Sequence, residues 1–286
     1  MGLYRLGEVR KMASPTLVVA FDSWVDAGGA STTAAGRLAD DGEVIATFDS
    51  DLLFDYRSRR PTLDIIDGRP KELTWPEVTL RQTKIGKRDV LVLWGLEPDF
   101  RWRELADDSV KLAKHFNVVE WISLGAIPAA VPHTRAVPIL GTESQPGLLL
   151  GDVQPGPQGL LRVPSAAISV LDMAIAVAGI PTVGYFAQVP HYVSGAYPAA
   201  AIELLRAVSK HLGQELDLKE LTEEASQLRT RLDAAIAVDE KTRLYLERLE
   251  SMADEARLPS GDDLIADIER FLRGGGTEGG SRERLN

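Results

Sequence analysis

Residues 16–40 read TLVVAFDSWVDAGGASTTAAGRLAD, an apolar run followed by a turn with two adjacent glycines and then an alanine-rich segment. The run at 16–21 (TLVVAF) is apolar without alternation, which predicts a strand buried on both faces. The alanine-rich residues 30–40 predict a helix directly after it. A doubly buried strand leading into a helix is typical of a parallel sheet that helices cover on both sides.

The same alternation continues to residue 213. Apolar runs predict further strands and the longer segments predict helices: strands at 44–48, 89–94, 118–124 and 181–189, and helices at 102–116, 164–178 and 198–212. Residues 64–66 and 78–85 are expected to form a hairpin or an edge pair, because polar residues alternate along the second segment. The sequence therefore predicts an α/β domain over residues 1–213, with a mainly parallel sheet flanked by helices.

The pattern changes after Gly213. Apolar side chains at alternating steps of three and four predict about three amphipathic helices over 214–273, with stripes at Leu221, Ala225, Leu228, Leu232 and Ala235, at Tyr245, Leu249, Met252 and Ala256, and at Leu264, Ile268 and Phe271. This segment has 16 Asp or Glu against 9 Lys or Arg, so it carries −7 of the total charge of −10. The glycine-rich residues 274–286 are expected to be disordered.

The composition excludes several classes of protein. No cysteine is present, which rules out disulfides and thiolate nucleophiles and fits a reducing, cytoplasmic compartment. A net charge of −10 disfavours nucleic acid as a partner, because phosphates need clustered basic groups. The most apolar stretch, 166–189, is interrupted by Asp172, Gly179 and Pro181, so no membrane span is expected. The N-terminal segment lacks the apolar core of a signal peptide.

The turn after the first predicted strand contains five candidate ligand-binding residues, Asp22, Trp24, Asp26, Gly28 and Gly29. Two glycines before a helix can present backbone N–H groups to an anion. The spacing of a phosphate-binding loop and its lysine are both missing, which predicts no nucleotide cofactor. The alternative is a tight strand-to-helix turn, in which Asp26 caps the helix and glycine permits close packing.

Two later loops supply the candidate catalytic residues His133, Arg135 and His191, with Tyr192 as a further ligand-binding candidate. A histidine base beside an arginine that holds an anion would suit a hydrolase or a phosphorylase. No serine lies in a G-x-S-x-G turn, and no histidine–carboxylate spacing predicts a metal site. The alternative is that these side chains make structural hydrogen bonds or interface contacts.

Four segments in a fixed order carry a resemblance to a known family: AFDSWVDAGGASTTAAGRL at 20–38, PHTR at 132–135, GPQGLL at 156–161 and VPHYVSGAYPAAAIELL at 189–205. In these segments the chain resembles the PAC2 (proteasome assembly chaperone 2-like) family, and its C-terminal helices are similar to the extension of bacterial, actinobacterial-type members. The resemblance implies a phosphorylase/hydrolase-like α/β fold, a homo-oligomer and no established small-molecule activity. The expected number of copies in the oligomer is three.

Relatives in that family act as chaperones in proteasome assembly, which implies proteasome subunits as partners. Members that dock on the proteasome carry a C-terminal hydrophobic–Tyr–any-residue tail, whereas Leu285 stands at the tyrosine position here, so docking through such a tail is not expected. The leading hypothesis is a non-enzymatic, oligomeric protein-interaction factor. The alternative is a hydrolase or transferase that acts on a nucleoside-like ligand at the carboxyl ends of the strands.

Overall fold

The computed structural model describes residues 2–255 apart from 23, 152, 154 and 158. The strands are β1 (Tyr4–Leu6), β2 (Thr16–Asp22), β3 (Glu43–Phe48), β4 (Thr62–Ile66), β5 (Arg69–Thr74), β6 (Val78–Ile85), β7 (Arg88–Leu96), β8 (Glu120–Ala129), β9 (Ile139–Glu143) and β10 (Thr182–Pro190). The helices are α1 (Ala30–Ala39), α2 (Ser50–Leu53), α3 (Trp102–His115), α4 (Ala167–Val177), α5 (Pro198–Leu212), α6 (Lys219–Ala237) and α7 (Glu240–Glu255), and a short 3-10 turn, η1 (Ala27–Gly29), precedes α1.

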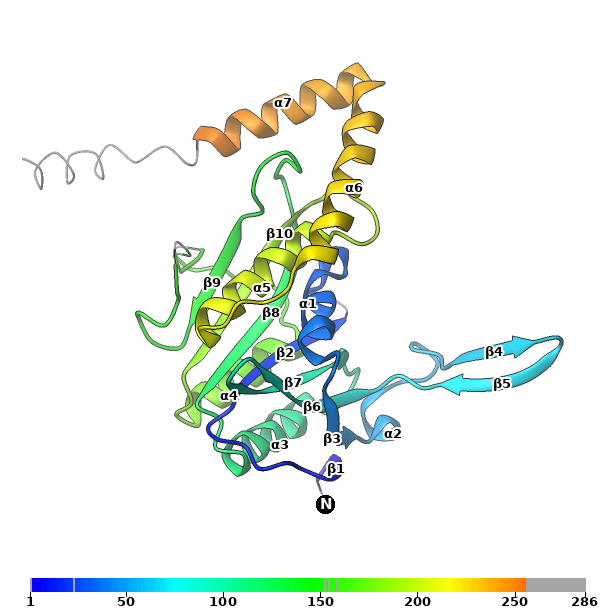
Figure 1. Cartoon of the computed structure of the whole chain (residues 1–286), viewed down its shortest axis with the longest axis vertical. Coiled ribbons are helices and arrows are strands. Elements are labelled where there is room, and N and C mark those ends of the chain that lie inside the picture. The colour runs from blue at the N-terminus through cyan, green and yellow to red at the C-terminus, as the bar shows by residue number, and fades with distance from the viewer. Residues whose placement is uncertain (1, 23, 152, 154, 158, 256–286) are drawn as a thin grey trace, which may run out of the picture.

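An eight-stranded sheet in the order β1-β3-β6-β7-β2-β8-β10-β9 forms the centre of the molecule (Figure 1). Its four middle strands, β7, β2, β8 and β10, run parallel, and antiparallel strands flank them on both sides. The four parallel strands lie at the runs of buried apolar residues in the sequence. The predicted α/β class, a sheet flanked by helices, is therefore confirmed; the sheet expected to be mainly parallel is parallel at its four middle strands and antiparallel toward both edges.

The alternation of side chains along β2 explains the layers. Val18 and Ala20 point to one face, where α1 and α5 complete a core, while Leu17, Val19 and Phe21 point to the other face, toward α3 and α4. All five side chains are almost completely buried. Helices cover both faces because every second residue of this strand needs an apolar neighbour on its own side.

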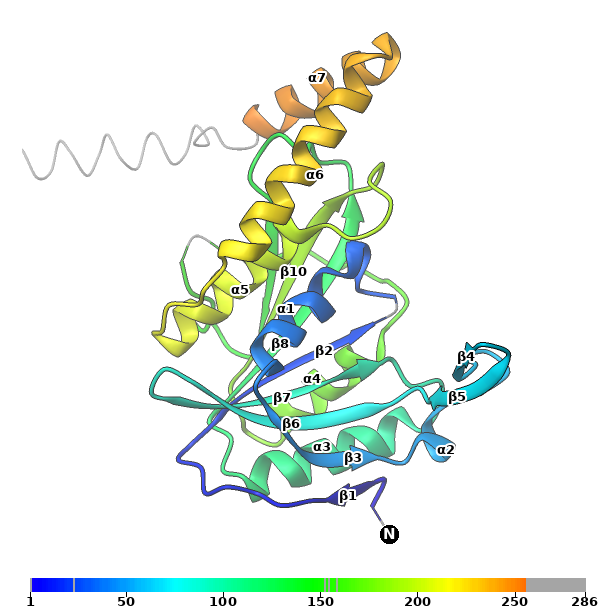
Figure 2. The ribbon, with the colours of Figure 1, turned by 45° about the vertical axis from the view of Figure 1, so that its right-hand side comes forward.

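The helices after residue 213 pack on the outside of these layers of helix and sheet. Leu221 of α6 is only 2% exposed, and Ala225, Leu228 and Leu232 lie against the core beneath α5. Ala235 is exposed, and Ile236 is the buried residue at the end of the helix. From there α7 folds back over the loops at one edge of the sheet (Figures 1 and 2). The expected third helix and the tail fall within 256–286, outside the described residues.

The predicted pairing of residues 64–66 with 78–85 is wrong. β4 pairs with β5, and the two form a separate two-stranded ribbon, whereas β6 pairs with β3 and β7 in the main sheet. The turn between β4 and β5 is Asp67-Gly68, and both residues have positive φ angles, 51° and 73°. Such a turn suits a tight two-residue hairpin, so the chain reverses before it reaches residue 78.

No helix in the described part of the chain is both long enough and apolar enough to span a membrane.

Candidate functional site

The carboxyl ends of the four parallel strands meet at one edge of the sheet, which is where α/β proteins of this kind bind ligands. The loop after β2 crosses to the end of β8, where the Ala126 amide donates to the Val25 carbonyl at 2.6 Å. The loops after β8 and β10 lie side by side, since the His191 amide donates to the Ala129 carbonyl at 3.0 Å. Asp22 is the last residue of β2, and all the other candidate residues lie on these loops, so this carboxyl edge is the candidate site.

The Asp26 carboxylate is occupied by the first turn of α1. It accepts hydrogen bonds from the amide and the hydroxyl of Ser31, both at 2.7 Å, and from the hydroxyl of Thr32 at 2.5 Å. The first amides of a helix have no partner within the helix, and a carboxylate there also faces the positive end of its dipole. With only 7% of its surface exposed, Asp26 holds the helix in place instead of facing a ligand.

The two glycines of the same turn serve close packing. Gly28 has a φ of 65°, and a Cβ added there would lie 2.8 Å from the Cβ of Tyr197. The Tyr197 amide donates to the Gly28 carbonyl at 2.9 Å. Gly29 also has a positive φ, 58°, but its Cβ position is open. Glycine adopts such angles with little strain. The close contact of Gly28 with Tyr197 ties this turn to the start of α5.

The remaining candidates of the turn face outward. Asp22 is exposed, and 63% of the Trp24 surface is exposed. These two side chains are free to contact another molecule, whereas Asp26 is engaged within the fold.

We expect Asp26→Ala to lower the free energy of unfolding by about 2 kcal/mol, the upper range for removal of a helix cap, because several donors of α1 lose their acceptor. Asp22→Ala is the matched control, since Asp22 is exposed in the same loop, and it is expected to change stability by less than about 0.5 kcal/mol. Urea unfolding checks both. Equal stabilities of the two variants would contradict the assigned role of Asp26.

His133 is buried between a tyrosine and a carboxylate. Its Nδ1 lies 2.8 Å from the Tyr192 hydroxyl, and its Nε2 lies 3.0 Å from Asp233 of α6. The His133 amide also donates to the Tyr192 hydroxyl oxygen at 2.9 Å. We therefore assign the Tyr192 hydroxyl as the donor to Nδ1, and Nε2 as the protonated ring nitrogen that donates to Asp233. The order tyrosine, histidine, aspartate has the form of a catalytic relay.

Two observations argue that this relay is structural. Burial raises the pKa of the Tyr192 phenol, so the group stays protonated and is a poor nucleophile. A second set of the same kind lies away from the carboxyl edge, where His211, near the end of α5, bridges the Tyr185 hydroxyl at 2.5 Å and Glu120, at the start of β8, at 2.7 Å. The chain therefore uses this arrangement to attach a helix to the sheet.

Arg135 and His191 also contact the C-terminal helices. The Arg135 guanidinium donates two parallel hydrogen bonds of 2.8 Å to Asp254 and one of 3.2 Å to Glu250. The hydrogen bonds to Asp254 and the charge of Glu250 raise the pKa of Arg135. The neighbouring Thr134 hydroxyl donates to Glu250 as well. On the other loop, His191 Nε2 lies 3.4 Å from the Tyr245 hydroxyl of α7.

A cleft of about 310 Å³ remains between α5, α6 and the loop after β8. His133 and Arg135 line it together with Arg206 and Arg229, but each arginine faces a carboxylate, Glu203 for Arg206 at 2.5 Å and Asp233 for Arg229 at 3.8 Å. Within the described residues, no group of three or more His, Asp or Glu side chains has the arrangement of a metal site.

The structure thus brings His133, Arg135, His191 and Tyr192 together at one place. His133, Arg135 and His191 each contact a residue of α6 or α7, and Tyr192 contacts His133. Asp26 is held apart from them by its bonds to α1. The arrangement serves to attach the C-terminal helices to the strand-end loops.

Comparison with known proteins places the fold in a family. A family model described as the PAC2 family matches residues 20–236, which is most of the chain. The chain belongs to the PAC2 family. The match runs past residue 213 into α6, so the first C-terminal helix lies within the region that PAC2 proteins share. No curated protein matches the chain.

Solved structures agree with this assignment. A Mycobacterium tuberculosis protein of unknown function has a TM-score of 0.83 and 32% identity, over 89% of this chain and 91% of its own. A Corynebacterium glutamicum protein of unknown function has a TM-score of 0.81 and 30% identity, over 88% and 97%. A proteasome-assembly chaperone homologue of Mycobacterium tuberculosis has a TM-score of 0.74 and 33% identity, over 81% and 99%.

The residues that complete the site of this PAC2 chain could not be predicted from its sequence, namely Asp233, Tyr245, Glu250 and Asp254. Asp233, Glu250 and Asp254 lie about a hundred or more residues further along the chain than the loop residues that they contact. One signal was present, because Glu250 and Asp254 are four residues apart and therefore share a face of a helix. Two carboxylates at that spacing can hold one arginine between them.

Proposed function

We propose that the chain is a non-enzymatic protein-interaction factor that works as a homo-oligomer in a role like that of the proteasome-assembly chaperones. The observation that carries this proposal is the similarity to the proteasome-assembly chaperone homologue of Mycobacterium tuberculosis, at 33% identity over 81% of this chain. The proposal includes three copies in the oligomer, proteasome subunits as partners and a cytoplasmic location, in keeping with the cysteine-free composition.

The geometry of the carboxyl edge supports a function in protein interaction instead of catalysis. His133 and Arg135 are bound to carboxylates of α6 and α7, His191 lies between the Ala129 carbonyl and the Tyr245 hydroxyl, and burial raises the pKa of the Tyr192 phenol. A hydrolase or transferase would need at least one of these groups free to reach a substrate. A hydrolase or transferase that acts on a nucleoside-like ligand is therefore the second candidate function.

The charge of the C-terminal segment supports a partner of opposite sign. Residues 214–273 carry a net −7, and most of the charged side chains of α7 are exposed. An acidic surface speeds the association with a basic partner and loses this advantage as salt rises. Proteasome subunits that present basic surfaces before assembly would fit such a chaperone.

Affinity capture tests the proposal. Full-length tagged chain is mixed with separately purified, unassembled α-type and β-type proteasome subunits of the same cell, and in parallel with assembled particles. We expect capture of unassembled subunits that weakens as salt is raised, and little capture of assembled particles. Asp107→Asn, at an exposed position of α3 outside the candidate site, should capture as well as the wild type. Failure to retain any subunit, at low salt and under assembly conditions, would contradict the proposal.

A further inference from the structure

A groove of about 840 Å³ lies beside the last turns of α7. The loop after β8 lines it together with parts of β9, β10 and α5, and Met252 and Ala253 line it from α7. Val131, Val137 and Ile139 are among its apolar side chains, and each is only partly buried. Apolar side chains that gather in this way mark a surface that another element covers.

The apolar stripe of α7 runs out into this groove. Leu249 is 2% exposed, whereas Met252, one turn later on the same face, is 51% exposed and lines the groove. A methionine side chain is flexible and fills irregular apolar gaps. The end of α7 therefore presents an apolar contact close to the point where the chain continues to residue 256.

The segment that follows α7 has the sequence of a further amphipathic helix. Residues 256–286 lie outside the described residues, and within them Leu264, Ile268 and Phe271 are spaced by four and three. An isolated helix of about ten residues is marginally stable in water, so such a helix needs an apolar surface on which to pack. Residues 262–272 include four acidic residues and one basic residue, a net charge of −3.

The groove offers a positive charge to an acidic segment. Lys210 of α5 lines it, is exposed, and makes no ion pair or hydrogen bond with another residue in the described part of the chain. The other two charged side chains of the lining are engaged, Arg135 by the carboxylates of α7 and Glu203 by Arg206. In the segment, Asp267 lies at the border of the predicted stripe, a position from which a carboxylate flanks an apolar contact.

We propose that residues 262–272 form a helix that packs into this groove of the same chain, with its apolar stripe on the groove and Asp267 beside Lys210. The connecting length agrees, because seven Cα steps lead from the end of α7 at Glu255 to residue 262 and span at most about 25 Å. The groove begins at α7 itself, so the chain need only turn back on that helix. The contact goes beyond the proposed function, since it holds whether or not the chain captures proteasome subunits.

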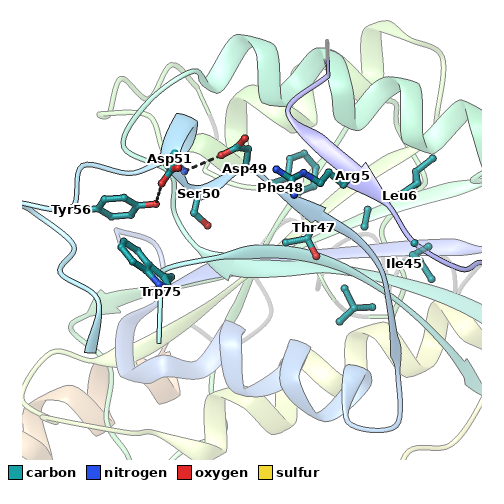
Figure 3. Close-up of a pocket in the computed structure, with 13 residues that line it drawn as sticks. Arg5, Leu6, Ile45, Thr47, Phe48, Asp49, Ser50, Asp51, Tyr56 and Trp75 are labelled. Carbon is teal, nitrogen blue, oxygen red and sulfur yellow. Dashed lines mark hydrogen bonds between the residues drawn. The ribbon is translucent and has the colours of Figure 1, made fainter. Parts of the chain in front are cut away.

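A second groove, of about 730 Å³, is a poorer site for this segment. β1, β3 and α2 line it together with Tyr56 and Trp75 (Figure 3). Its charged side chains are Arg5, Asp49 and Asp51, a net charge of −1 that does not attract an acidic segment. It also lies toward the opposite edge of the sheet, because six strand steps of about 4.8 Å separate β3 from β9. The groove at α7 is therefore the one that we assign.

Hydrogen exchange on the full-length chain tests the contact through a matched pair of variants. Met252→Asp places a charge in the groove, and Leu244→Asp changes a residue of α7 that is similarly exposed, 53% against 51%, and does not line it. We expect the amides of 262–272 to exchange at least about tenfold faster in Met252→Asp than in the wild type, because an undocked helix of this length opens readily. Leu244→Asp should exchange like the wild type.

Charge exchange tests the place of Asp267. Lys210→Glu is expected to speed the exchange of the same amides about twofold to fivefold, the effect of one exposed ion pair. Lys210→Glu/Asp267→Lys should restore the wild-type rate, because the two side chains would again have opposite charges. A double variant that exchanges as fast as Lys210→Glu alone would contradict this pairing.

Cross-linking identifies both the groove and the copy of the chain. The chain has no cysteine, so introduced thiols are the only ones present. Ile268→Cys with Ala136→Cys, at an exposed residue of the groove beside α7, should give a product with a short thiol-to-thiol reagent. On a denaturing gel this product should run at the mass of one chain, 31.1 kDa. Ile268→Cys with Thr47→Cys, at an exposed residue of the second groove, should give little product.

Three results would overturn the inference: hydrogen exchange at 262–272 that is the same in Met252→Asp as in the wild type, equal cross-linking of the two cysteine pairs, or a product at the mass of two chains. The last result would place the segment on a second copy of the chain.

Discussion

Leu221→Asp is expected to lower the free energy of unfolding by about 3 kcal/mol or more and to release α6 and α7 from the body. Leu221 is 2% exposed and belongs to the core that α1 and α5 form with the sheet. The change removes a fully buried leucine and places an unpaired charge among apolar groups, and each effect alone is severe. Once α6 is released, His133 loses its contact with Asp233.

Urea unfolding measures the loss of stability, and limited proteolysis measures the release of the helices. Cleavage within 219–255 should be much faster in the variant than in the wild type. Leu244→Asp is the control, because Leu244 is 53% exposed on α7 and the change should alter stability by less than about 0.5 kcal/mol. If Leu221→Asp unfolds and is cleaved like this control, α6 does not belong to the core.

Asp172→Asn is expected to stabilise the chain at pH 8 by up to about 4 kcal/mol and to leave it nearly unchanged near pH 4. The Asp172 carboxyl group of α4 accepts hydrogen bonds from the Trp121 indole at 2.8 Å and from the Ser123 hydroxyl. Burial raises its pKa from 3.8 to about 7, although these two hydrogen bonds act in the opposite direction. Asparagine keeps an oxygen acceptor and carries no charge.

The sign follows from proton linkage. Between pH 4 and 7 the folded chain holds a proton on Asp172 that the unfolded chain has lost, so the contribution of this group to stability is greatest at low pH and falls as the pH rises through this range. The difference in unfolding free energy between variant and wild type should therefore grow from pH 4 to pH 7 and then level off. Asp107→Asn, at an exposed position of α3, is the control. A difference that is constant with pH would show that Asp172 titrates as an ordinary surface carboxyl group.

The central sheet was predictable because each of its middle strands has a distinctive apolar sequence. The runs at 16–21, 89–94, 118–124 and 181–189 are apolar on both faces, and only a strand with helices on both sides can bury such a run. They became β2, β7, β8 and β10, which lie next to one another in the sheet. Helix α5 was predicted with the bounds observed, since Pro198 suits the first turn of a helix and Gly213 ends it with a φ of 60°.

The edges of the sheet were harder to predict. β1 has only three residues and β9 only five, too few to show a periodic pattern, and the sequence of β5, RPKELT, is mostly polar because the strand has no buried face. One feature of the sequence does favour the ribbon. Asp67-Gly68 is a strong hairpin dipeptide, and it favours the pairing of 62–66 with 69–74 that the structure shows.

The site was predictable in its place but not in its partners. Fold class alone puts the loops after β2, β8 and β10 at one edge, so His133, Arg135 and His191 could be named from the sequence. What these residues contact depends on how α6 and α7 lie on the body, and that is set by long-range packing. The predicted division at residue 213 stays a proposal. The burial of Leu221 argues that the helices beyond it and the α/β body form one folding unit.

The central proposal is that the carboxyl edge of the sheet holds the chain's own helices in place of a small ligand. Thermal unfolding of the full-length wild type in rising concentrations of adenosine, ATP and inorganic phosphate tests it most directly, because a ligand at about 100 times its dissociation constant adds about 2.7 kcal/mol to the stability. The melting temperature is predicted to stay constant with each compound. A melting temperature that climbs with the logarithm of the concentration, and no longer does so in His133→Gln, would contradict the claim.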